Sequence, residues 1–284
     1  MATLREIRRR IRSVRNTAQI TKTMEMVSAA KLRRAQSVVE AARPYATLLR
    51  EVLDNLAQAS GDVLHPAFIR RDEVKTRAVV LLTSDRGLAG AFNANLIRTA
   101  EIRIRETGRP ARLVLLGKKG YDYFRRRNAD ILFYRADLGG VADWGVAEGL
   151  AQDLLQRFIA GEIDEVDIVT THFKSALSRE IVVGTLLPLG AERAAGTPSR
   201  DYIFEPGPEE ILAKIVPYFL AMRIYTALAE SAASEHGARM IAMGSATKNA
   251  NEMIQTLTLF MNRTRQATIT REIVEIVAGA EALK

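Results

Sequence analysis

Two long stretches with helical periodicity, one at each end of the chain, most constrain what this sequence can fold into. The first runs from about Thr3 to Gln58 and contains no glycine and a single proline. The second runs from Glu209 to about Ala278, after a proline at 208 that suits the first position of a helix. Apolar residues recur every three or four positions in both stretches, which predicts amphipathic α-helices.

The length of these helices decides how they are used. At 1.5 Å per residue they would be about 80 Å and about 110 Å long, whereas a compact chain of this size is only about 50 Å across. The helices must therefore extend beyond any globular part and bury their apolar stripes against each other, which predicts an antiparallel coiled coil. In the first helix we count Ile20, Met24 and Val27 among the apolar positions of the stripe.

The middle of the chain changes to short apolar runs that alternate with helical patterns. Such alternation predicts an α/β domain, Rossmann-like, with a mostly parallel sheet. We expect the last two strands to form an antiparallel edge because only a short polar stretch separates them. The expected strands are 78–82, 112–116, 131–134, 166–171 and 181–187, and the expected helices are about 91–106, 118–127 and 143–160.

The predicted organisation has three parts joined by two linkers. Residues 1–58 form the N-terminal coiled-coil helix, 77–189 the central α/β domain, and 209–284 the C-terminal coiled-coil helix that pairs with the first. Linkers rich in glycine, proline and charge are expected at about 59–76 and 190–207.

Positive charge is concentrated at the start of the chain. The net charge is +8, and residues 1–50 alone hold twelve Lys or Arg against three Glu, a net of +9. A basic helix of this kind suits nucleic acid, an anionic membrane surface or a carboxylate-rich protein face. Aromatic side chains that could stack on bases are missing before Tyr45. A cleavable transit peptide is also Arg-rich, but this pattern continues as helix for forty residues more. Docking on acidic protein is the best of these interpretations.

Composition argues against several kinds of chemistry. The chain has no cysteine and three histidines, so disulfides, thiolate chemistry and cysteine metal sites are excluded and a histidine-rich metal site is not expected. We predict no cofactor, no metal and no catalytic residue. No uninterrupted apolar stretch of about 18 residues occurs, so any membrane association is expected to go through partners.

One loop invites a functional hypothesis. The segment Thr83–Gly90 follows the first expected strand and precedes a helix, which is where doubly wound folds hold phosphates. It matches neither the dinucleotide nor the Walker glycine pattern. The favoured interpretation is a tight turn that presents Arg86 to a neighbour. Two Ser-x-x-Lys pairs, Ser28–Lys31 and Ser245–Lys248, lie inside the long helices and are read as chance spacing.

Five separated motifs resemble the gamma subunits of F-type ATP synthases, in the same order and spacing. They are ATLREIRRRI at 2–11, ITKTMEMVSAAK at 20–31, SDRGLAG at 84–90, SAASEHGARM at 231–240 and NRTRQATITRE at 262–272. Many relatives carry cysteine where Ala89 stands, and the chloroplast form has a cysteine-bearing insertion that this chain lacks, so thiol regulation is not expected.

The resemblance implies a rotor. The coiled coil would stand inside a ring of alpha and beta subunits, and the α/β domain would contact epsilon and the c-subunit ring. Rotation driven by proton flow would force the beta subunits through ATP synthesis, with the catalytic residues on alpha and beta. Met24, Arg33, Arg34 and Arg86 would face an acidic loop of beta, and Arg265 and Gln266 would grip a second beta loop.

The resemblance also sets the expected location and the rival hypotheses. Without a recognisable cleavable presequence, a bacterial origin and the cytoplasmic face of the plasma membrane are expected. The alternatives are a basic coiled-coil nucleic-acid-binding protein, whose affinity would fall steeply with salt, and a nucleotide-binding α/β enzyme, which its ligand would stabilise.

Overall fold

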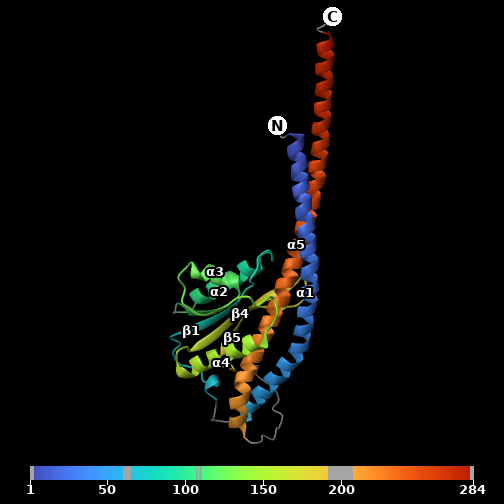
Figure 1. Ribbon diagram of the computed structural model, residues 1–284. Coiled ribbons are helices and arrows are strands. Elements are labelled where there is room, and N and C mark those ends of the chain that lie inside the picture. Colours follow the sequence, from blue (N-terminus) through green and yellow to red (C-terminus); the bar gives the residue numbers. More distant parts are fainter. Residues whose placement is uncertain (1–2, 60–64, 107, 109–110, 191–206, 282–284) are drawn as a thin grey trace. The chain divides into compact units, whose positions relative to one another are not determined.

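The computed structural model describes residues 3–59, 65–106, 108, 111–190 and 207–281 (Figure 1). Within these residues the helices are α1 (Leu4–Ala59), α2 (Phe92–Glu106), α3 (Lys118–Arg125), α4 (Trp144–Ala160) and α5 (Pro208–Glu281). The strands are β1 (Arg77–Leu82), β2 (Ala111–Leu116), β3 (Ile131–Arg135), β4 (Glu165–Phe173) and β5 (Arg179–Leu187), and a 3₁₀ turn spans Pro66–Phe68. Residues 60–64 of the first expected linker and 191–206 of the second lie outside the described residues.

The chain divides into two compact units, which are described separately below. One consists of Met1–Val27 with Met240–Lys284, and the other of Ser28–Arg239. The predicted fold class is confirmed: two long terminal helices pack together and a central sheet carries helices on its faces. The three-part division at 1–58, 77–189 and 209–284 stays a prediction.

The sheet belongs to the unit Ser28–Arg239 and has the strand order β3-β2-β1-β4-β5. The first four strands in this order run parallel, and β5 pairs antiparallel with β4 at one edge, as predicted. Each expected strand and helix forms, with ends within three residues of the prediction. Short apolar runs, continuous in β1 and β2, were therefore sufficient to find the strands.

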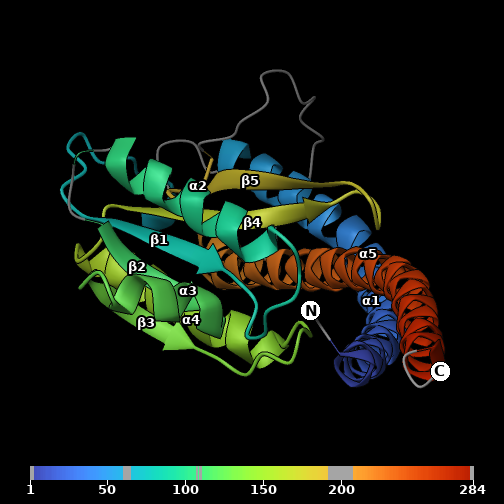
Figure 2. The same ribbon diagram turned by 90° about the horizontal axis from the view of Figure 1, so that it is seen from above.

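The two faces of the sheet build two cores (Figure 2). In β1, Ala78, Val80 and Leu82 pack on the face that carries α4 and the paired parts of α1 and α5. Val79 and Leu81 point to the opposite face, against α2 and α3. A strand buried on both faces reads as a continuous apolar run, which is why β1 lacks a polar side.

In the unit Met1–Val27 with Met240–Lys284, α1 and α5 pair antiparallel. Thr21 Oγ1 lies 2.8 Å from Thr247 Oγ1, while earlier in α1 Ile7 shares a groove with Leu257. Residues nearer the start of α1 thus contact residues nearer the end of α5, as an antiparallel pair requires.

The stripe of α1 that faces α5 differs from the predicted one at its middle. Ile20 and Val27 are exposed, at 61% and 52%, while Thr21 and Ser28 are buried. The register is set by the apolar residues on either side, because the buried positions of α1, apart from Asn55, follow one heptad pattern. They are Ile7, Ile11, Ala18, Thr21, Ser28, Leu32, Ala35, Val39, Ala42, Leu49, Leu53 and Leu56. The buried Thr21 hydroxyl is satisfied by Thr247 and by the carbonyl of Ala18.

The last turns of α5 lie beyond the start of α1 (Figure 1). From Ile269 to Ala280 every residue is exposed. The large apolar side chains there are Ile269, Ile273, Val274, Ile276 and Val277. An exposed apolar surface of this kind is a feature of interaction sites.

α5 is also long and apolar enough to meet a length-and-composition test for a membrane span. Half of its apolar window is buried inside the structure. The buried core helix of a folded protein meets the same test, so this observation does not by itself place α5 in a membrane.

Candidate functional site

The loop Thr83–Gly90 joins β1 to α2 and is tied to the start of α3. The Thr83 side-chain oxygen accepts a hydrogen bond from the Gly120 amide at 2.9 Å. The Asp85 carboxylate accepts from the Lys118 amide at 3.0 Å, and the Ser84 carbonyl accepts from the Lys119 amide at 3.1 Å. These bonds fix the loop against the N-terminus of α3. The phosphate site considered from the sequence would lie at the N-terminus of α2 instead.

The other side of the loop is held by α5. The Arg239 guanidinium donates to the carbonyl of Gly87 at 3.2 Å and to that of Arg86 at 3.4 Å. Arg239 also pairs with Glu235, one turn earlier, at 2.8 Å. Both side chains are buried. The result is a loop whose backbone is fixed while the Arg86 and Leu88 side chains are exposed.

His236, next to Glu235, is buried and neutral. Its Nε2 lies 3.0 Å from the Gly140 carbonyl and therefore carries the proton, while Nδ1 has no hydrogen-bond partner. Burial is the main cause that lowers the pKa of His236 from 6.5 to about 4. Burial also raises the pKa of Glu235, against the opposing effect of Arg239. Protonation of His236 therefore destabilises the fold as the pH falls, whereas protonation of Glu235 stabilises it.

This arrangement predicts a pH effect on stability. Between pH 6.5 and about 4 the unfolded chain protonates at His236 before the folded chain does, so acid favours unfolding. The contribution of His236 is complete above pH 6.5 and is lost as the pH falls toward 4. His236→Gln, which keeps a donor for Gly140, should lose less stability between pH 7 and pH 5 than the unmodified chain in urea unfolding. Glu235 acts in the opposite sense in both proteins, so parallel curves would contradict the prediction.

The residues predicted to meet partners are divided between the two units. Arg33 and Arg34 are exposed on α1 and Arg86 is exposed on the loop, all in the unit Ser28–Arg239. Among the described residues no acidic side chain forms an ion pair with any of these three. Their charges are therefore available to a partner.

The remaining predicted positions belong to the unit Met1–Val27 with Met240–Lys284. Met24 is half-buried on α1, and Arg265 and Gln266 are exposed on α5. The neighbour of Met24, Glu25, lies against Gly244. About 30 Å of helix separates Gly244 from Arg265 at 1.5 Å per residue. Met24 and Arg265 therefore cannot belong to one compact site.

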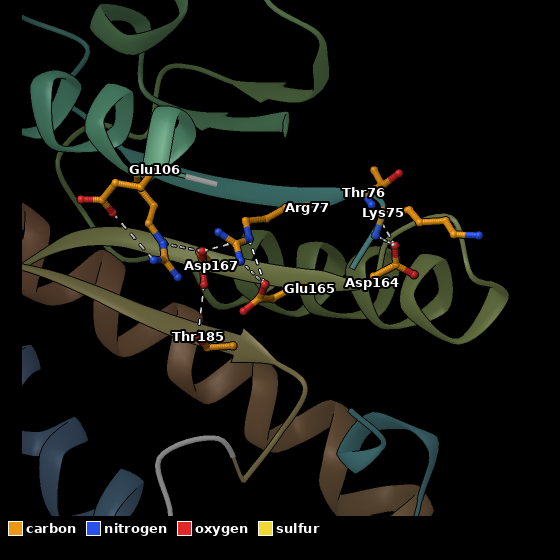
Figure 3. Close-up of polar contacts among 9 residues, drawn as sticks. Lys75, Thr76, Arg77, Glu106, Asp164, Glu165, Asp167 and Thr185 are labelled. Carbon is orange, nitrogen blue, oxygen red and sulfur yellow. Dashed lines mark hydrogen bonds and ion pairs between the residues drawn. The ribbon is translucent and has the colours of Figure 1, made fainter. Parts of the chain in front are cut away.

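Acidic residues at the start of β4 are engaged in ion pairs (Figure 3). Asp167 is fully buried and accepts from Arg103 at 2.8 Å and from the Thr185 hydroxyl at 3.1 Å. Arg77 binds Glu165 and approaches Asp167 at 3.5 Å. This network fixes β1, β4, β5 and α2 together, and its carboxylates have structural partners.

Asp164, just before β4, is also held by structural partners. Asp164 accepts from the amides of Lys75 and Thr76 and pairs with Arg71 (Figure 3 shows the first two). These bonds lower the pKa of Asp164 against its burial, which acts in the raising direction and is the largest single influence. Over the described ranges, no group of three His, Asp or Glu is placed to hold a metal ion.

Antiparallel terminal helices, with an α/β unit between them in the sequence and exposed cationic side chains, define the class of architecture: a paired-helix protein with an inserted α/β domain. The family model described as ATP synthase matches residues 3–283. The chain is 51% identical over 284 residues to the ATP synthase gamma chain of Moorella thermoacetica, with all of both chains covered. It is 48% identical over 286 residues to that of Desulforamulus reducens, again over all of both chains.

Solved structures agree. The chain resembles one in the central stalk and c-ring structure of the Tetrahymena thermophila mitochondrial ATP synthase, with a TM-score of 0.62 and 26% identity, over 80% of this chain and 99% of that one. A chain of the Euglena gracilis mitochondrial ATP synthase rotor has the same fold, with a TM-score of 0.66 at 19% identity, over 94% of this chain and 98% of that one. The chain belongs to the family of ATP synthase gamma chains.

Proposed function

We propose that this chain is the central rotor shaft of a bacterial F-type ATP synthase. The paired helices α1 and α5 stand inside a ring of alpha and beta subunits, and the α/β unit contacts epsilon and the c-subunit ring. Proton flow turns the shaft, and the catalytic residues belong to alpha and beta. The observation that carries this proposal is the antiparallel pairing of the two ends of the chain in a full-length relative of bacterial gamma chains.

The location follows from the same proposal. The machine works at the cytoplasmic face of the plasma membrane, and this chain reaches the membrane through its partners. The exposed arginines of α1 and of the loop suit carboxylates on beta. The exposed apolar end of α5 suits an apolar collar within the ring.

Within this function we assign contacts with beta to six residues. Met24, Arg33, Arg34 and Arg86 face an acidic loop of beta, and Arg265 with Gln266 grips a second loop. Exposed ion pairs contribute only about 0–1 kcal/mol each. Torque therefore depends on many contacts together and on steric repulsion between shaft and ring, and no single ion pair dominates.

A rotation assay tests this distribution. Arg265→Ala and Gln266→Ala, introduced singly into the assembled enzyme, should each slow ATP-driven rotation and leave it running, because the remaining contacts persist. Arg263→Ala is the control, since residue 263 lies about 200° around the helix from 265 and is also exposed. Complete loss of rotation in either single variant would contradict the proposal that the load is shared.

A further inference from the structure

An open groove of about 470 Å³ lies between α2 and α3, on the sheet face that these helices cover. Its wall from α2 carries Asn93, Ala94, Ile97, Arg98 and Glu101. Its wall from α3 and the following turn carries Lys119, Asp122, Tyr123, Arg126 and Arg127. None of the six residues assigned to beta lines it, so what binds here is a separate question from the proposed function.

The charges of the groove are positive in balance. Arg98, Lys119 and Arg126 form no ion pair with any residue that the structure describes. Glu101 is engaged inside the groove, since it accepts from the Tyr123 hydroxyl at 2.9 Å and lies 3.8 Å from Arg127. Among the described lining residues, the groove therefore has three side-chain cations without an ion-pair partner and one such carboxylate, that of Asp122.

The size and lining of the groove favour a peptide. A volume of this order holds several side chains and is much larger than a phosphate ion. Ala94 and Ile97 give it apolar contact area. The Arg127 guanidinium lies 3.6 Å from the centroid of the Tyr123 ring, so that ring face is not open to a base.

We infer that the α2–α3 groove is a docking site for an acidic segment of a partner protein, one that carries several Asp or Glu and at least one apolar side chain. Its carboxylates meet Arg98, Lys119 and Arg126, and its apolar side chain lies on Ala94 and Ile97. Mixed charge around a small apolar area is typical of such interfaces.

The test uses the full chain, which contains no cysteine, so one introduced cysteine gives one labelled position. Ala94→Cys carries a fluorophore in the groove, and Gln152→Cys carries the same fluorophore on the exposed side of α4. The probes are a short peptide of Asp, Glu and one Leu, the same peptide with Asn and Gln, and MgATP. The acidic peptide should change the signal at residue 94 alone, and the neutral peptide should not.

Two adjacent arginines provide matched charge variants. Arg126 lines the groove, whereas Arg125 lies against Tyr121 outside it. Arg126→Gln should weaken peptide binding by about two- to fivefold, the range for one exposed ion pair, and Arg125→Gln should not. Amide hydrogen exchange of the unlabelled chain should show protection of α2 and α3 by the acidic peptide, which excludes an effect of the label.

Three results would overturn the inference. Equal signals at residues 94 and 152, or equal effects of the two arginine variants, would mean general attraction to a basic chain. A response to MgATP that the acidic peptide cannot displace would make the groove a nucleotide site. An absence of both the fluorescence change and the amide protection would mean that no acidic segment binds there.

Discussion

Gly117→Ala is expected to lower the free energy of unfolding by about 4 kcal/mol, from strain at positive φ and from overpacking. Gly117 precedes α3 with φ of 99°. A Cβ there would lie 2.0 Å from the Thr83 carbonyl oxygen and 2.6 Å from its carbon. Because both are backbone atoms at the end of β1, the loop and α3 would have to separate. The hydrogen bonds from the α3 backbone amides to the Thr83 and Asp85 side chains would be lost with that movement.

Gly139→Ala is the matched control. Gly139 also has positive φ, 65°, but nothing lies within 4 Å of the position that a Cβ would take there. Its replacement should cost only the backbone strain, about 1 kcal/mol. Urea unfolding of both variants measures the difference. Equal losses would mean that the close approach to Thr83 has no energetic weight.

Asp167→Ala is expected to cost about 3 kcal/mol, the lower end for breaking a buried ion pair. The substitution leaves the Arg103 guanidinium and the Thr185 hydroxyl without their buried acceptor. Arg77 keeps Glu165, which holds the loss at this lower end. The affected contacts join β1, β4, β5 and α2, so the whole sheet should be less stable (Figure 3).

Glu106→Ala removes a weaker partner of the same arginine and serves as the control. Glu106 is 59% exposed and lies 4.0 Å from Arg103. Its loss should cost less than about 1 kcal/mol, as for other exposed pairs. Thermal unfolding at constant pH compares the two variants. A change at Glu106 as large as that at Asp167 would show that burial of the carboxylate is not what matters.

Helices and strands were predictable because their side-chain periods are local properties of the sequence. The register of the helix pair was only partly predictable. Ile20 and Val27 are more apolar than Thr21 and Ser28, yet the latter face inward. Apolar residues before and after this segment fix the heptad, and Thr247 on α5 satisfies the Thr21 hydroxyl. Local hydrophobicity cannot report a register that is set by residues several turns away.

The candidate site shows the same division. Arg86 was predictable as an exposed turn residue because the loop follows a buried strand and contains two glycines. The roles of Glu235 and Arg239 were missed, although both belong to a motif quoted from the sequence. Arg239 acts on Gly87, which is 152 residues away in the chain. The spacing of Glu235 and Arg239 by four residues was the available signal, and it indicates a pair on one helix face without showing what that pair holds.

ATP hydrolysis tests the central claim most directly. It should be measured for this chain alone, for alpha with beta, and for all three together. The account predicts that the chain alone is inactive and that its addition gives a stable complex with sustained turnover. Hydrolysis by the chain alone, or failure to join the alpha–beta ring, would contradict the account and return the loop Thr83–Gly90 to consideration as an active site.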